Sequence, residues 1–208
     1  MPRLPPATLY LLWIITGGYL LQMLAPEAML RWFALWPVGS EGIGGSAFLP
    51  WQLVTYAALH GSFVHIFFNG FALWMFGSVI ETTWGTRRFV QFAVACIVAA
   101  GLTQLLLGML GVFPAAPTIG ISGLTYGLLL AYGMMFPNQQ VMLLIPPIPM
   151  KAKYLVMIFA GLALFMGLTG GGGVAHFAHL GGMLGGWLMI RYWRGQPPFK
   201  GRGPRRMV

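Results

Sequence analysis

The stretch Gly120-Ile121-Ser122-Gly123 opens a long apolar run that extends to Phe136. Glycine on either side of a serine lets other backbone approach closely and leaves the hydroxyl uncrowded. Such a serine is either a small packing residue between membrane helices or a reactive group. A second polar residue, His179, lies in another apolar run at a depth that we expect to be similar. This pairing favours chemistry over packing.

The composition of the chain is that of a membrane protein. Of its 208 residues, 58% are hydrophobic and 7% are charged, and the mean hydropathy is +0.76. A soluble domain carries about 25% charged residues. Crossing the hydrocarbon core takes about 20 apolar residues, and helices satisfy their own backbone hydrogen bonds there. We therefore predict an all-α polytopic membrane protein with one membrane domain, residues 1–208, and six spanning helices at about 7–25, 60–80, 89–111, 121–136, 154–169 and 175–193.

The net charge of +9 follows the expected helix ends. If the N-terminus is cytoplasmic, eleven of the twelve Lys and Arg residues lie inside and only Arg31 lies outside. This asymmetry is typical of membrane proteins. We therefore expect both termini in the cytoplasm, with a basic tail at residues 194–208 that contacts anionic lipid. Nucleic-acid binding is the less favoured interpretation of this charge.

In that orientation, four polar side chains from three helices share the outer half of the membrane: His65, Asn69, Ser122 and His179. Polar groups inside a membrane are costly and indicate function. Serine becomes a nucleophile when a base takes its proton, and histidine is the usual base. His65 and Asn69 are four residues apart on one helix face. With the Ser122 backbone N–H, they are placed to donate hydrogen bonds to an oxyanion.

A serine hydrolase often uses an acid to orient its histidine. The only acidic residues of this chain are Glu27, Glu41 and Glu81. None is expected near His179, so we predict a Ser–His dyad. Tyr126 lies four residues after Ser122, on the same helix face. It is the candidate for orienting the His179 ring by stacking.

Glycines on two helices are spaced for close packing. Gly123 and Gly127 form one small-xxx-small pair, and Gly182 and Gly186 form another. Two further glycines, Gly181 and Gly185, add to the second surface. We expect these surfaces to bring the helices at 121–136 and 175–193 together.

Taken together, these motifs resemble the rhomboid family of intramembrane serine proteases over about residues 50–190. The resemblance rests on His65-Ile-Phe-Phe-Asn69, on Gly120-Ile-Ser122-Gly123 with Tyr126, and on Ala178-His179-Leu180-Gly181-Gly182. It implies a compact six-helix bundle that hydrolyses the transmembrane segments of substrate proteins near the membrane surface. It also implies Ser122 as nucleophile and His179 as base, with His65 and Asn69 at the oxyanion. No cofactor or metal is expected.

One position departs from the family pattern. Many members have Trp-Arg in the first external loop, where this chain has Trp51-Gln52. The departure puts the stability of the loop in doubt more than catalysis. The same loop is rich in Trp and Phe, so we expect an interfacial structure there.

The other histidines leave two alternatives open. His176 lies three residues before His179 and near the same helix face, so it is the alternative base. We prefer His179, because Gly181 and Gly182 follow it and the family motif places the base there. A zinc site built from all four histidines, including His60, is disfavoured. No acid or cysteine accompanies them, and His-Glu-x-x-His is absent.

Two functional alternatives also remain. One is an inactive rhomboid-like protein that binds membrane helices, and the other is a small transporter or channel. Intact Ser122 and His179 weigh against the first, and the lack of acidic residues in the membrane interior weighs against the second. The small size suggests a prokaryotic plasma-membrane protein whose site opens to the outer side. The glycine run at residues 170–173 is either a flexible connection or the hinge of a cap.

Overall fold

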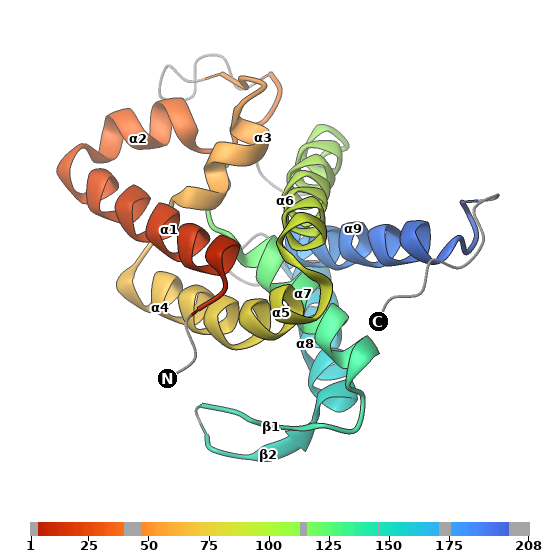
Figure 1. Ribbon diagram of the computed structural model, residues 1–208. Coiled ribbons are helices and arrows are strands. Elements are labelled where there is room, and N and C mark those ends of the chain that lie inside the picture. Colours follow the sequence, from red (N-terminus) through yellow and green to blue (C-terminus); the bar gives the residue numbers. More distant parts are fainter. Residues whose placement is uncertain (1–3, 40–46, 113–115, 145, 171–175, 200–208) are drawn as a thin grey trace.

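A computed structural model describes residues 4–39, 47–112, 116–144, 146–170 and 176–199. The chain is mostly helical (Figure 1). Its elements are α1 (Pro6–Leu24), α2 (Pro26–Phe33), α3 (Gln52–Thr55), η1 (Tyr56–Ala58), α4 (Phe63–Ala72), η2 (Leu73–Gly77), α5 (Ser78–Trp84), α6 (Thr86–Met109), α7 (Ser122–Met135), β1 (Gln140–Met142), β2 (Pro149–Lys151), α8 (Ala152–Leu168) and α9 (His176–Arg194).

Each of the six predicted apolar runs contains a helix. Within the described residues, three helices are long and apolar enough to cross a membrane: α1, the continuous stretch Phe63–Trp84, and α6. Helix α8 is apolar but shorter. Helix α7 has 14 residues, which at 1.5 Å per residue gives about 21 Å, less than the hydrocarbon core of about 30 Å. The structure thus supports a helical membrane bundle, and the number of spans stays a prediction.

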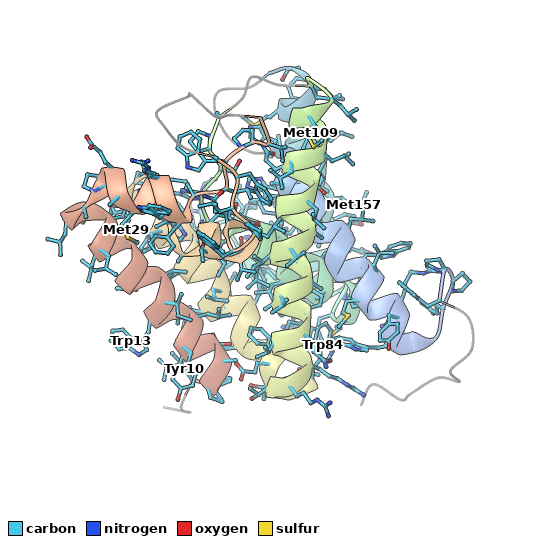
Figure 2. The ribbon with its side chains drawn as sticks, turned by 90° about the horizontal axis from the view of Figure 1, so that it is seen from above. Tyr10, Trp13, Met29, Trp84, Met109 and Met157 are labelled. Atoms are coloured by element: carbon cyan, nitrogen blue, oxygen red, sulfur yellow. The ribbon has the colours of Figure 1, made fainter. Side chains whose placement is uncertain are left out.

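Apolar side chains on the outside of the bundle fit lipid contact. Tyr10 and Trp13 project from α1 (Figure 2), and each is 66% exposed. Trp84 and Met109 lie near opposite ends of α6 in the same view. Helix α1 packs along the stretch formed by α4, η2 and α5, as Figure 1 shows.

Helix α9 is the centre of the other half of the bundle, where it packs against α6, α7 and α8. Glycine makes the contact with α7 possible. A Cβ atom on Gly182 would overlap the backbone carbonyl of Gly123. No side chain fits between the two helices at this point, so their backbones approach directly.

The second glycine surface differs from the expectation. A Cβ atom on Gly186 would first meet Phe92 and Cys96 of α6, and Cβ atoms on Gly181 and Gly185 would also meet α6. A step of four residues turns a helix by about 400°, or 40° more than a full turn. The glycine face of α9 therefore moves from α7 toward α6 along its length, and Gly182 is the glycine of this pair whose Cβ position is closest to α7.

The loop before α4 braces the turn that carries Ser122. Leu35 and Thr118 exchange backbone hydrogen bonds, and Gly120 N–H donates to the carbonyl of Tyr56. Gln52 is fully buried. Its side chain accepts hydrogen bonds from the Trp36 and Leu49 N–H groups and donates to the carbonyls of Arg31 and Ala47. The glutamine thus satisfies the backbone of a loop that the sequence had put in doubt.

A β-hairpin was not predicted. Strand β1 pairs antiparallel with β2, with Gln140 opposite Lys151 and Met142 opposite Pro149. The hairpin connects the end of α7 to the start of α8 (Figure 1). Strands of three residues beside several prolines give almost no alternating pattern, so the all-α prediction holds for the bundle and misses this connection.

Candidate active site

The backbone before Ser122 takes a conformation that requires glycine. Gly120 has φ of +113°, and a Cβ atom there would lie 2.7 Å from Cε1 of His65. Helix α7 then begins at Ser122. The first N–H groups of a helix have no partner within the helix, and they carry the positive end of its dipole. The Ser122 backbone N–H is one of these groups.

Ser122 and His179 form a direct contact between α7 and α9. The Nε2 atom of His179 lies 2.8 Å from Oγ of Ser122. His179 is 8% exposed. With the ring proton on Nδ1, Nε2 accepts the hydrogen bond from the serine hydroxyl, which is the geometry needed for proton transfer.

Two aromatic contacts hold the His179 ring. The Tyr126 ring stacks on it, with centroids 4.2 Å apart and planes 13° from parallel. The His176 ring meets it at 85° and 6.0 Å. Tyr126 in turn contacts Phe159 of α8 edge-on. Packing therefore restricts the imidazole orientation.

No carboxylate takes part in this arrangement among the described residues. The Nδ1 atom of His179 has no hydrogen-bond partner there. Glu81 is occupied at α1, and Glu27 is exposed on α2. Glu41 lies outside the described residues.

His65 and Asn69 present donors beside Ser122. Nδ1 of His65 accepts a hydrogen bond from the Gly61 N–H, which assigns the ring proton to Nε2. That nitrogen is close to Gly120, because a Cβ atom there would lie 2.9 Å from it. Oδ1 of Asn69 accepts from the Thr125 hydroxyl at 3.2 Å. The same hydroxyl lies 3.0 Å from the backbone carbonyl of Ser122, so Thr125 links Asn69 to the start of α7.

Sequence reasoning missed two polar residues of this region. Thr125 orients Asn69, and its only signal was a position three residues after Ser122. Gln104 of α6 lines the same cavity, and its buried Oε1 has no partner among the described residues. A glutamine within an apolar helix was the available signal.

His60 stands behind His65. Its ring is 1% exposed and meets the His65 ring at 4.9 Å and 64°. It lies ahead of the first residue of α4. Within the described residues, no three His, Cys, Asp or Glu side chains are placed to hold a metal ion.

One cavity of about 1140 Å³ is lined by the four predicted catalytic and oxyanion residues, His65, Asn69, Ser122 and His179. Its walls come from α4 and η2, from α7, from α8 and from the start of α9. Residues 141–144 of the hairpin region also line it. We call this cavity the groove: the polar cluster of His65, Asn69, Ser122 and His179 lines it together with apolar residues of α7, α8 and the hairpin region.

The Rhomboid domain family matches residues 48–195, more than half of the chain. Rhomboid protease GlpG of Yersinia pestis (strain Pestoides F) is 29% identical over 194 residues, which cover 90% of this chain and 62% of that protein. Rhomboid protease GlpG of Yersinia pseudotuberculosis serotype I (strain IP32953) matches with the same identity and coverage. Rhomboid-like protein 19 of Arabidopsis thaliana is 27% identical over 161 residues, 74% of this chain and 52% of that protein.

This chain thus spans about three fifths of the length of its bacterial relatives. The family match covers the segments that carry the histidine, asparagine and serine motifs. Together with its apolar helices, that match shows that the chain is an integral membrane protein of the rhomboid family.

Proposed function

We propose that this chain is an intramembrane serine endopeptidase that cleaves peptide bonds in or near the transmembrane segments of other proteins. Ser122 is the nucleophile and His179 the general base. The observation that carries this proposal is the 2.8 Å contact between Ser122 Oγ and His179 Nε2. The similarity to bacterial proteins named Rhomboid protease GlpG supports it.

The first half of the reaction forms an acyl-enzyme. His179 Nε2 takes the hydroxyl proton while Ser122 Oγ bonds to the carbonyl carbon of the substrate. The carbonyl oxygen becomes an anion. His179 then gives the proton to the leaving amine as the C–N bond breaks.

In the second half, His179 takes a proton from water, and the water oxygen bonds to the acyl carbon. Collapse of this second intermediate breaks the bond to Ser122 Oγ. The serine oxygen recovers its proton from His179, and the carboxylic acid product leaves. No acid is required if Tyr126 holds the ring, because stacking fixes its orientation.

His65, Asn69 and the Ser122 backbone N–H are proposed to stabilise the oxyanion. The assigned donors, His65 Nε2–H and the Asn69 NH₂ group, line the same cavity as Ser122. Donors that are already in place cost no reorganisation during the reaction.

Topology is a second part of the proposal. We infer six membrane crossings, with both termini in the cytoplasm, residues 27–50 outside and the site opening to the outer side. The eleven-to-one split of cations supports this orientation. In a Cys96→Ser background, Glu41→Cys should react with an impermeant thiol reagent from outside, and Gly203→Cys should not. Labelling of position 203 from outside would invert the arrangement.

The function is tested by reconstitution in liposomes with a fluorescent transmembrane substrate. We expect the wild-type chain to cut it and Ser122→Ala to bind without cutting. Circular dichroism should show the same helix content in both. Binding without turnover by the wild-type chain would favour the alternative, an inactive rhomboid-like protein.

A further inference from the structure

The cavity that holds Ser122 and His179 extends to the β-hairpin between α7 and α8. Residues 141–144 line it together with Leu155 and Phe159 of α8. Helix α7 starts at Ser122 and has 14 residues, so the far end lies about 20 Å from the serine. The hairpin is therefore the end of the groove opposite to the polar cluster.

The hairpin is anchored to the bundle. Val141 is 6% exposed and belongs to the apolar core. The backbone of α8 is tied to the connection after α7, because Ala152 N–H donates to the Gln139 carbonyl at 2.9 Å. Leu143 N–H donates to the Ile148 carbonyl at 3.1 Å. These contacts fix the backbone that carries Met142 and Leu144.

Met142 and Leu144 present apolar surface at this end of the groove. Met142 is 56% exposed and Leu144 is 40% exposed, and both line the cavity. Methionine adapts its shape to different apolar neighbours. Ile148, on the returning side of the hairpin, is 48% exposed and is not among the residues that line the cavity.

We propose that Met142 and Leu144 of the hairpin select substrates by contacting the inner part of their transmembrane segment. This inference rests on the proposed protease function. The occupant is an apolar helix rather than a lipid chain, because the groove is continuous with the Ser122–His179 pair. A peptide whose cleaved bond lies at Ser122 places the rest of its membrane segment along that groove. A helical residue about 14 positions from the cleaved bond reaches the hairpin.

The test uses three substrates. The first carries leucine at about 14 residues from the cleaved bond on the membrane side, and the second carries glutamate there. The third ends about six residues from the cleaved bond, so in helical form it extends about 9 Å and does not reach the hairpin. Leu144→Lys is the test variant, and Ile148→Lys is the matched control on the same hairpin.

We expect Leu144→Lys to lower kcat/KM for the leucine substrate about tenfold, mainly through KM. It should favour the glutamate substrate over the leucine substrate, because the carboxylate pairs with the new ammonium group. The short substrate and fluorophosphonate labelling of Ser122 should not change. Ile148→Lys should behave like the wild-type chain on all three substrates.

Several outcomes would overturn the inference. An equal loss of kcat/KM for the leucine substrate in Leu144→Lys and Ile148→Lys would indicate a general effect on the hairpin. Equal loss on the long and short substrates would indicate damage to the site. An unchanged kcat/KM of Leu144→Lys for the leucine substrate would indicate that lipid, not substrate, occupies the inner part of the groove. Failure of the proposed function looks different, since the wild-type chain would then cut none of the three.

A second measurement does not depend on turnover or on a buried charge. Leu144→Cys is combined with Ser122→Ala and Cys96→Ser, and the substrate carries cysteine at about 14 residues from the cleaved bond. Oxidation should cross-link the two chains. The same substrate should not cross-link to Ile148→Cys, and equal cross-linking at both positions would contradict the inference.

Discussion

Two of the buried polar clusters among the described residues differ in how far their hydrogen bonds are completed. At the start of α1, the Glu81 carboxylate accepts hydrogen bonds from the Ala7 and Thr8 N–H groups and from the Thr8 and Thr86 hydroxyls. At the start of α7, His179 binds Ser122 through Nε2, and its Nδ1 has no partner among the described residues.

The difference separates structure from chemistry. Glu81 is 2% exposed. It accepts hydrogen bonds from N–H groups at the start of α1 that have no partner within the helix, where a negative charge is favourable. The Ser122–His179 pair lines a cavity instead, so its groups remain available to a substrate. Substitutions at the first cluster should change stability, and substitutions at the second should change turnover.

The largest effect on turnover is expected for His179→Ala. Loss of the base should lower kcat by about 10⁴-fold or more. His176→Ala, the matched control, removes a ring that meets the His179 ring edge-on at 6.0 Å and should keep activity within about tenfold, which is small beside the loss of a catalytic base. Kinetics in liposomes would decide. An active His179→Ala with a dead His176→Ala would assign the base to His176.

Asn69→Ala should have the second-largest effect on turnover. Losing one oxyanion donor costs about 10²–10³ in rate, and His65→Ala should behave similarly. Both donors serve one charge, so the double variant should lose less than the product of the single losses. The measurement is kcat for both singles and the double, beside fluorophosphonate labelling of Ser122. Full activity in Asn69→Ala would remove that residue from the site.

Gly182→Ala tests whether backbone contact sets the geometry of the pair. Its methyl group would overlap the Gly123 carbonyl and push α9 from α7. We expect turnover to fall about tenfold, because small displacements at a reacting pair have large rate effects. The free energy of unfolding should fall by about 1–3 kcal/mol. Gly161→Ala is the control, because a Cβ atom there has open space; similar losses in both would contradict the account.

Glu81→Gln should have the smallest effect on turnover, less than about threefold per folded molecule, since no catalytic interaction is removed. Its effect should appear in stability instead. Replacing a buried charged acceptor should cost about 2–3 kcal/mol, in the range of charge-assisted hydrogen bonds. Denaturation in mixed micelles, paired with activity assays, separates the two. A well-folded Glu81→Gln without turnover would contradict the dyad and the contrast between the clusters.

Hydropathy was sufficient to predict a helix in each of the six apolar runs, because apolar runs of this length have few alternatives in lipid, but it did not predict the short helices α2 and α3. Helical spacing placed His65 with Asn69 and Ser122 with Tyr126, since residues four apart share a face. These predictions needed only local geometry.

Other features depended on partners far along the chain. Which helix Gly186 faces, which backbone groups Glu81 accepts from and how Gln52 fills its loop are set by tertiary packing. The hairpin has strands too short to show a period. Such contacts cannot be read from spacing within one segment.

Labelling by a fluorophosphonate probe tests the central claim most directly, because the probe forms a bond only with an activated serine. The wild-type chain in liposomes should be labelled, with the adduct found on Ser122 by mass spectrometry. His179→Ala, folded but without the base, should be labelled at less than about one hundredth of the wild-type rate. A folded wild-type chain that stays unlabelled, or an adduct on another residue, would contradict the assignment of Ser122 and His179 as an active pair.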